Sequence, residues 1–300
     1  MRAVVIRRFG GPEVLEVIEA PLPEPGPGQV RVRVAAAGLN PADLAARAGL
    51  FGPAELAPGE FLGLGWDVAG TVDALGSGVS GPAEGTAVVG LVSGSGRRFK
   101  AHAEYVVVDA DAVAAAPSSV GLVHAATLPV NAPTADQALG LLGARPGDRL
   151  LVTGAAGAVG GFAVQLAHHA GLRVVALARA DDEPLLRELG ADEAVASLDG
   201  VRADAALDAA VLGSPVLAAV RDGGAYVTAR PGAVPAAERG IRVAAVQVRP
   251  DGARLAELVA LADRGVLTTR VADTYPLADA AKAHARLAEG GLRGRLVLVP

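Results

Sequence analysis

The sequence predicts an α/β protein with a β-rich domain and a parallel-sheet domain, and two patterns support this prediction. In roughly the first 115 residues, short apolar segments are separated by glycine and proline turns, which is typical of a barrel-like β domain. After that, strands alternate with helices, which indicates a parallel sheet with right-handed crossovers. We place the β-rich domain at residues 1–118, completed by 266–300, and the parallel-sheet domain at residues 119–265.

The β-rich part is marked most clearly by Gln29–Ala35, where apolar and polar residues alternate as in a half-buried strand. Further strands are expected at Ala3–Arg7, Val14–Ile18, Val68–Leu75, Ala87–Leu91 and Ala103–Val108. Clusters such as Gly76-Ser77-Gly78 fit the turns between strands, because glycine adopts backbone angles that other residues avoid.

The parallel-sheet part shows repeated strand–helix pairs. Strands are expected at Arg149–Thr153, Arg173–Ala178, Ala203–Asp208 and Ala225–Ala229. Helices are expected at Ala135–Leu142, Gly160–Ala170, Asp182–Leu189, Ser214–Val220 and Arg254–Asp263. The final apolar run, Leu296–Val299, is expected to return as a strand to the β-rich domain.

Composition and charge exclude several classes of protein. The chain has 300 residues, no cysteine and a formal net charge of -5. It can therefore form no disulfide, iron–sulfur cluster or thiolate zinc site, and its acidity argues against nucleic acid or an anionic membrane as the main partner. The uncharged stretch Leu150–Leu172 is rich in glycine, so we interpret it as a strand–turn–helix and not as a membrane span. Because the start carries no targeting segment, we expect a cytoplasmic protein.

The most informative segment is the turn that follows Leu150–Thr153. It consists of small residues and leads into a helix: Gly154, Ala155, Ala156, Gly157, Ala158, Val159 and Gly160. This context fits a dinucleotide-binding turn, in which small residues let the backbone approach a pyrophosphate and the helix N-terminus offers free N–H groups. The glycine pattern fits two registers, one beginning at Ala155 and one at Gly154. A purely structural turn is the less favoured alternative.

The end of the second strand indicates which dinucleotide binds. A site that prefers NAD places an acidic residue there, whereas this chain has Ala178 followed by Arg179. An arginine can pair with the 2′-phosphate of NADPH, so NADPH is the predicted cofactor. The alternative is a solvated Arg179, and the nearby Asp181 and Asp182 would weaken a phosphate site that they faced. Ala229 ends another strand at the edge where ligands gather in such sheets.

Motifs along the chain carry a family resemblance. They are Phe9–Leu15, Ala36–Asp43, Arg47–Gly49, Gly65–Val72, Ala125–Pro129, Thr134-Ala135, Gln165–Ala167, Glu188–Asp192, Tyr275–Leu277 and Gly294–Leu298. With them the chain resembles the zinc-free, zeta-crystallin-like NADPH:quinone oxidoreductase branch of the medium-chain dehydrogenase/reductase superfamily. The resemblance implies a GroES-like catalytic domain, an inserted Rossmann domain and a homodimer.

The same resemblance implies that no metal is bound. Asn40 stands where zinc-dependent relatives carry cysteine, and Trp66-Asp67 stands where they carry a His-Glu pair. His168 and His169 are adjacent on a helix and therefore point about 100° apart, so they cannot grip one ion. The remaining histidines, His102, His124 and His284, are expected to be isolated surface or hydrogen-bonded polar residues.

The resemblance also implies three residues near the reacting groups. Asn40 is expected beside the nicotinamide and the substrate, where its amide would bind a substrate oxygen; a turn role is an equal alternative. Phe51 would stack on a flat substrate ring, with core packing as an equal alternative. Thr134 is expected near the nicotinamide. Trp66 is expected either to line the pocket or to pack in the core.

These features predict a reductase that transfers hydride from NADPH to a quinone or an activated enone. One alternative is an enoyl or alkenal double-bond reductase on the same scaffold, and another is a protein that binds NADPH without turnover. Nucleophilic catalysis is not supported, because the chain has no G-x-S-x-G elbow. The expected partner is a small molecule, with no nucleic acid and no membrane.

Overall fold

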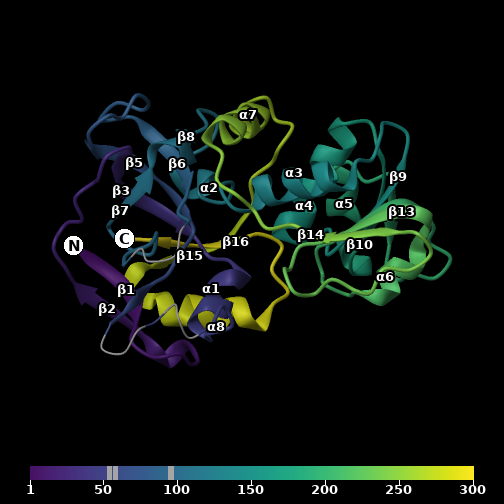
Figure 1. Ribbon diagram of the computed structural model, residues 1–300, viewed down its shortest axis with the longest axis horizontal. Coiled ribbons are helices and arrows are strands. Elements are labelled where there is room, and N and C mark those ends of the chain that lie inside the picture. Colours follow the sequence, from purple (N-terminus) through teal and green to yellow (C-terminus); the bar gives the residue numbers. More distant parts are fainter. Residues whose placement is uncertain (53–55, 57–59, 94–97) are drawn as a thin grey trace. The chain divides into compact units, whose positions relative to one another are not determined.

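The structure is a computed structural model that describes residues 1–52, 56, 60–93 and 98–300 (Figure 1). It divides into two compact units. The first comprises Met1–Val130, Arg249–Asp263 and Thr269–Pro300, and the second comprises Asn131–Val248 and Arg264–Thr268. Residues 119–130 and 249–263, which we expected in the parallel-sheet domain, thus belong to the first unit.

Helix α7 (Gly252–Asp263) accounts for part of this difference. It packs on strand β8 (Val113–Ala115) and on the short helix η3 (Ala110–Ala112). Its last residue, Asp263, accepts a 2.8 Å hydrogen bond from the backbone N–H of Ser119. These contacts join α7 to the β-rich unit, although its helical sequence pattern continues the βα alternation.

The described part of the first unit contains two sheets. A three-stranded sheet has the order β2-β1-β4, with β1 at Arg2–Ile6, β2 at Leu15–Glu19 and β4 at Leu62–Gly63. The larger sheet runs β15-β16-β3-β5-β6-β8, and β7 also pairs with β3. Its strands are β15 (Val271–Pro276), β16 (Arg295–Val299), β3 (Gln29–Gly38), β5 (Asp67–Leu75), β6 (Ala87–Leu91), β7 (Tyr105–Asp109) and β8.

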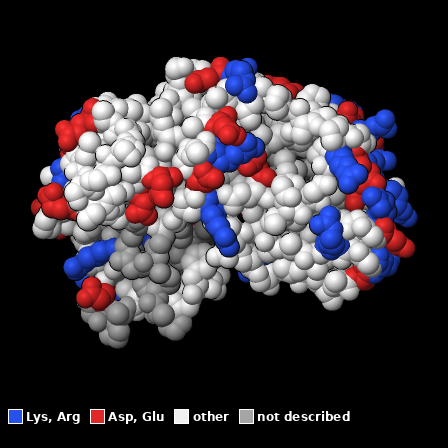
Figure 2. All heavy atoms as spheres, turned by 45° about the horizontal axis from the view of Figure 1, so that its top comes forward, with Lys and Arg blue, Asp and Glu red and all other residues white. Residues whose placement is uncertain are grey.

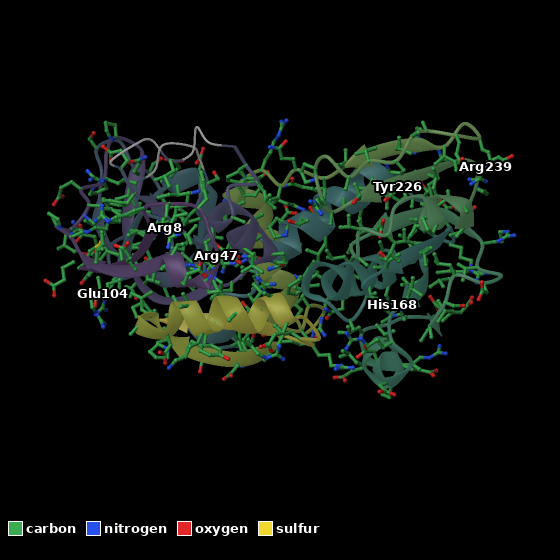
Figure 3. All side chains as sticks on the ribbon, turned by 90° about the horizontal axis from the view of Figure 1, so that it is seen from below. Arg8, Arg47, Glu104, His168, Tyr226 and Arg239 are labelled. Atoms are coloured by element: carbon green, nitrogen blue, oxygen red, sulfur yellow. The ribbon has the colours of Figure 1, made fainter. Side chains whose placement is uncertain are left out.

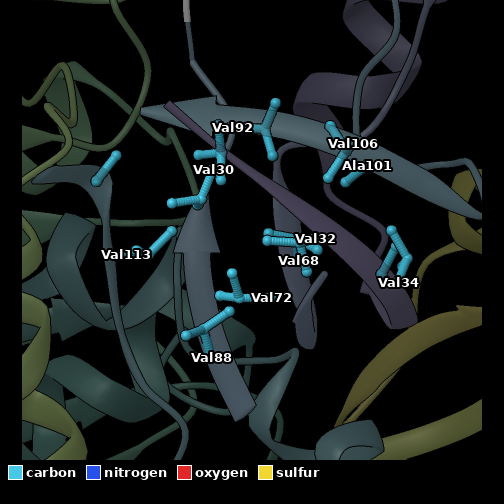
Figure 4. Packing of buried hydrophobic residues seen from close by; sticks show 13 residues of the cluster. Val30, Val32, Val34, Val68, Val72, Val88, Val92, Ala101, Val106 and Val113 are labelled. Atoms are coloured by element: carbon cyan, nitrogen blue, oxygen red, sulfur yellow. The ribbon is translucent and has the colours of Figure 1, made fainter. Parts of the chain in front are cut away.

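The core cluster around β3, β5 and β6 in this unit is formed mainly by valines (Figure 4). In β3 the buried positions Val30, Val32 and Val34 alternate with more exposed ones, which confirms the half-buried strand expected there. Antiparallel pairing of β3 with β16 joins Val297 to Gly38, so the last strand returns to this unit as predicted. Full burial of each valine removes apolar surface worth about 2 kcal/mol from water.

The second unit is a parallel sheet of the order β11-β10-β9-β12-β13-β14 in its described residues, drawn in teal and green in Figure 1. The strands are β9 (Arg149–Thr153), β10 (Arg173–Leu177), β11 (Glu193–Val195), β12 (Ala203–Asp208), β13 (Val220–Thr228) and β14 (Arg242–Ala245). The helices are α3 (Asn131–Leu142), α4 (Ala158–His169), α5 (Glu183–Glu188) and α6 (Ser214–Ala219), with the short helix η4 at Ala180–Asp182. This arrangement confirms the predicted α/β class.

Several elements were not predicted. They are α1 (Pro41–Arg47), α2 (Leu122–Ala125), α8 (Ala280–Glu289), β4, β8, β11, β14, β15 and the short helices η1 (Pro12–Val14), η3 and η5 (Leu277–Asp279). Strand β15 is largely exposed, so it lacks the alternation that marks a half-buried strand. Within the described residues, no helix is long and apolar enough to cross a membrane.

Candidate nucleotide and substrate sites

The small-residue turn forms a tight loop between β9 and α4. Gly154 has φ +58°, a left-handed conformation that favours glycine, and its carbonyl accepts a 2.8 Å hydrogen bond from the N–H of Gly157. A Cβ on Gly160 would lie only 2.2 Å from the Gly154 carbonyl oxygen. Residue 160 must therefore be glycine for the helix to pack so closely on the turn. Gly157 precedes the first residue of α4, so this helix N-terminus begins inside the turn.

The strand ends bring the predicted cofactor residues to one edge of the sheet. All strand pairs in this sheet are parallel, and their last residues are aligned: Thr153 pairs with Leu177 and Asp208, and Asp208 pairs with Thr228. The turn follows β9, Ala178 and Arg179 follow β10, and Ala229 follows β13. This shared carboxyl edge is where nucleotides bind in open α/β sheets. The geometry fits a dinucleotide in the cradle that begins at Gly154.

The side chain of Arg179 is exposed and makes no hydrogen bond or ion pair with any residue that the structure describes. Ala178 is half-buried, and its N–H donates to the carbonyl of Val195 over 3.1 Å. Thr134 is 7% exposed and lies on α3, in the same unit as the turn. Arg179 is thus available to an anionic ligand, and contact of any of these residues with a cofactor remains a prediction.

A buried carboxylate at this edge escaped the sequence reasoning. Asp208 ends β12 with no exposed surface and accepts hydrogen bonds from Thr153 Oγ1 (2.6 Å), Tyr226 Oη (2.7 Å) and the N–H of Gly213 (2.8 Å). Burial, and then the neighbouring Asp208, raise the pKa of Tyr226, so the phenol keeps its proton and donates a hydrogen bond to the carboxylate. Tyr226 is labelled in Figure 3 on the ribbon of this unit.

The loop that Asp208 anchors is strained. Val211 has φ +58°, which a β-branched residue rarely adopts. The N–H of Ala210 donates to Thr153 Oγ1 over 3.0 Å, and a Cβ on Gly154 would lie 3.2 Å from the Ala210 nitrogen. The hydrogen bonds to Asp208 and Thr153 hold this loop directly against the small-residue turn. A strained backbone conformation of this kind persists only where neighbouring contacts hold it in place, and such residues cluster at ligand sites.

In the first unit, Asn40 lies in a buried polar cluster. It is 2% exposed, its Nδ2 donates to Asp67 Oδ2 over 2.7 Å, and its Oδ1 accepts from Arg295 Nη2 over 2.6 Å. Its backbone N–H donates to Asp43 Oδ2 over 2.7 Å, at the start of α1. These contacts give Asn40 a role in positioning α1. Its expected contact with a substrate oxygen remains a prediction.

The two carboxylates in this cluster are fully buried. Asp43 also accepts from the N–H of Gly65, and Asp67 from the N–H of Val130. Burial raises the pKa of both groups to about 7, and the positive charge of Arg295 acts in the opposite direction. The balance between charged and neutral forms at this cluster therefore depends on Arg295.

Two histidines are placed differently from our expectation. His102 and His284 are buried, with their ring centroids 5.8 Å apart, and are therefore neither isolated nor on the surface. His284 Nδ1 accepts from Arg47 over 3.2 Å, while its Nε2 and both ring nitrogens of His102 make no hydrogen bond in the described residues. Burial lowers the pKa of His102 to about 4 and that of His284 to about 2, so both rings are neutral. The hydrogen bond of His284 fits the expected alternative of a hydrogen-bonded polar residue, whereas the surface position is wrong for both rings. Their proximity could not be predicted, because residues far apart in sequence leave no local spacing signal.

Phe51 stands at one end of an aromatic group. Its ring is 54% exposed and meets Trp66 edge to face, with centroids 6.1 Å apart. Lys100 Nζ lies 4.6 Å from the centroid of Trp66. This exposure disfavours the core-packing alternative for Phe51. The aromatic surface is therefore available to a planar ligand.

On the face shown in Figure 2, acidic and basic side chains are interspersed. No broad surface of a single sign stands out there. In the described residues, no group of three or more histidine, aspartate or glutamate side chains can hold a metal ion.

Comparisons with known proteins agree with the fold described above. A family model described as "Alcohol dehydrogenase GroES-like domain" matches residues 26–118, and one described as "Zinc-binding dehydrogenase" matches residues 188–298. The chain is 30% identical to the chloroplast envelope quinone oxidoreductase homolog of Arabidopsis thaliana, over 97% of this chain and 95% of that protein.

Two further proteins are similar. The chain is 34% identical to the chloroplastic NADPH-dependent alkenal/one oxidoreductase of Arabidopsis thaliana over 206 residues, which are 65% of this chain and 52% of that protein. The match thus spans about half the length of that relative. The structure of the quinone oxidoreductase from Coxiella burnetii superposes with a TM-score of 0.90 and 29% identity, covering 100% of this chain and 99% of that one.

Proposed function

This chain belongs to the medium-chain dehydrogenase/reductase superfamily, and from that premise we propose that it reduces a quinone or an activated enone with NADPH. The observation that carries the proposal is the turn from Gly154 to Gly160, where only glycine fits at the last position and the helix begins within the turn. When bound, NADPH supplies a hydride to an electron-poor carbon of the substrate, whose oxygen then takes a proton from solvent.

In the proposed function, the turn and the first turn of α4 hold the pyrophosphate. The backbone N–H groups at the start of a helix carry partial positive charge and favour an anion. Asp208 keeps the neighbouring loop in place through Gly213, and Thr153 does so through Ala210. These residues position the cofactor without touching the reacting atoms.

The choice of NADPH over NADH is assigned to Arg179. Its exposed guanidinium has no partner among the described residues and follows β10, next to Ala178. A charge-assisted bond to a 2′-phosphate contributes about 1.5–3 kcal/mol. The name of the NADPH-dependent alkenal/one relative supports the same choice.

The substrate is assigned to the surface formed by Phe51 and Trp66. A planar quinone or enone can stack on an exposed ring, and Phe51 has no acidic proton to donate. As the resemblance implies, Asn40 is proposed to bind a substrate oxygen, and Thr134 is proposed to contact the nicotinamide. A homodimer and a cytoplasmic location complete the proposal, on the strength of the resemblance and of the composition.

A double-bond reductase is the second candidate, favoured by the 34% identity to an alkenal/one oxidoreductase. Steady-state NADPH oxidation with matched sets of ortho-quinones, para-quinones, alkenals and enones separates the candidates. A clear preference in kcat/KM for quinones supports the first candidate, and a preference for alkenals or enones supports the second. Tight NADPH binding with no turnover of any compound would leave only the third reading, a protein that binds NADPH without catalysis.

A further inference from the structure

The buried charges of the first unit need an electrostatic explanation that the proposed reaction does not give. Asp43 and Asp67 have no exposed surface, and a buried carboxylate is stable only when it is paired, hydrogen-bonded or bound to a cation. Both accept two hydrogen bonds, yet backbone and amide donors carry no full charge. A nearby cation would stabilise the charged forms of both groups further.

In zinc-dependent proteins that cation is a metal, and the family model over residues 188–298 is described as a zinc-binding dehydrogenase. The residues here do not fit one. Both oxygens of Asp67 already accept hydrogen bonds, one from the Asn40 amide over 2.7 Å and one from the N–H of Val130, and the amide N–H of Asn40 is not a metal ligand. The described residues also contain no group of three or more side chains that could serve as ligands.

A protein cation is present in the same cluster. Arg295 is 6% exposed at the start of β16, and its Nη2 donates to Asn40 Oδ1 over 2.6 Å. Asn40 in turn donates to Asp67 and, through its backbone N–H, to Asp43. Arg295 is therefore linked to Asp67 through the side chain of Asn40, and to Asp43 through the backbone N–H of the same residue.

We propose that the guanidinium of Arg295 takes the place of a metal ion in this unit: it supplies the positive charge for Asp43 and Asp67 and holds Asn40 by its amide oxygen. Arg295 is thus a positioning residue, and it fixes the start of α1. Because Arg295 lies on β16, the cluster gains its cation only when the C-terminal strand has paired with β3.

The test is a double-mutant cycle on thermal unfolding, which does not depend on turnover. Arg295→Met leaves two buried carboxylates without a cation, and we expect the Tm to fall by roughly 10 °C, the size that loss of one partner of a buried pair gives. Asp67→Asn introduced together with Arg295→Met removes one of those charges. The double variant is expected to unfold at a higher temperature than the sum of the two single losses predicts.

Arg47→Met is the matched control, because Arg47 is also a buried arginine but contacts Gly10 and His284. The fall in Tm caused by Arg47→Met should simply add to the fall caused by Asp67→Asn when both changes are combined. Arg295→Lys keeps the charge and loses the planar donor pair, so its Tm should lie between those of the native chain and Arg295→Met. If the falls in Tm caused by Arg295→Met and by Asp67→Asn simply add in the double variant, the proposal is wrong.

A cobalt titration of the native chain provides a second measurement that does not require a folded variant. We expect no stoichiometric Co²⁺ in the dialysed protein and no d–d absorption band. One tightly bound Co²⁺ per chain that is lost in Asp67→Asn would show that the cluster accepts a metal, and would contradict the role assigned to Arg295.

Discussion

Thr153 Oγ1 donates a 2.6 Å hydrogen bond to Asp208 Oδ1, and this contact joins the ends of two neighbouring parallel strands. The same threonine oxygen accepts from the N–H of Ala210, while the other carboxylate oxygen of Asp208 accepts from Gly213. The two side chains thus fix the loop after β12 beside the small-residue turn. They set the shape of the proposed nucleotide site.

Asp208→Asn should therefore weaken both the fold and cofactor binding. The variant replaces one carboxylate oxygen of Asp208, a hydrogen-bond acceptor, by an NH₂ group. This donor then faces another donor, an N–H or O–H group, which lowers the free energy of unfolding by about 1–3 kcal/mol. Urea unfolding measures the loss, and fluorescence titration with NADPH measures the Kd. Tyr226→Phe removes only one donor and should cost about 1 kcal/mol. Equal Kd values for Asp208→Asn and the native chain would refute the positioning role.

Gly160→Ala should abolish tight NADPH binding. Its Cβ would lie 2.2 Å from the Gly154 carbonyl oxygen, so helix and turn must separate. We expect a Kd at least roughly tenfold higher, which corresponds to about 1.4 kcal/mol. Gly140→Ala is the control, because a Cβ there meets nothing within 4 Å in the last turn of α3. That variant should bind NADPH normally and gain about 0.5–1 kcal/mol of stability.

Arg179→Ala should raise the KM for NADPH far more than the KM for NADH. The reason is that only NADPH carries the 2′-phosphate assigned to this guanidinium. Arg173→Ala changes an exposed arginine at the opposite end of the same strand and should leave both constants unchanged. If Arg179→Ala raises the two KM values by the same factor, Arg179 does not read the phosphate.

Phe51→Ala should raise the KM for planar substrates by roughly tenfold, since loss of a stacking ring costs about 0.5–1.5 kcal/mol beyond the lost area. The KM for NADPH should stay the same. The neighbouring Leu50 is 68% exposed, so Leu50→Ala serves as the control for a change on the same surface. An unchanged substrate KM in Phe51→Ala would place the substrate elsewhere.

The buried histidines predict a loss of stability in acid. Their pKa values, about 4 for His102 and about 2 for His284, lie below the ordinary value of 6.5. For these two groups the unfolded chain binds more protons than the folded chain below pH 6.5, so their contribution to stability falls as the pH drops from 6.5 towards 4. Asp43 and Asp67, whose pKa is raised to about 7, act in the opposite direction in this range, so the histidine effect is measured as a difference between variants. Above pH 6.5 these two groups contribute no pH dependence.

His284→Gln removes one titrating group and keeps an acceptor for Arg47. The free energy of unfolding of this variant, measured in urea, should fall less between pH 7 and pH 5 than that of the native chain, by about 1.4 kcal/mol per pH unit within the titrating range of the one histidine removed. His168→Gln, an exposed position, gives the reference slope. A His284→Gln slope equal to the native one would mean that His284 is not buried in its neutral form.

Sequence periodicity predicted most of the fold because buried strands and crossover helices leave a regular pattern. Val30, Val32 and Val34 show the period of two, and the Gly154–Gly160 turn sits between an apolar strand and a helix. Helix α8 was missed although its apolar residues recur at helical spacing, and that signal could have found it.

The site was predictable only where it is local in sequence. Asp208 ends an expected strand, but nothing near it indicates that Tyr226 and Thr153 donate to it. Arg295 and Asn40 meet because β16 returns to β3 from the other end of the chain. Contacts between residues that are far apart in the chain leave no recognisable pattern in a single sequence.

The central claim is tested most directly by a single-turnover reaction with NADPH deuterated at the transferred C4 position. The account predicts a primary isotope effect on NADPH oxidation, and one deuterium on the carbon of an enone product that lies β to its carbonyl. Oxidation of NADPH by an enone without deuterium on the carbon β to its carbonyl, or no oxidation with any quinone or enone, would contradict hydride transfer by this protein.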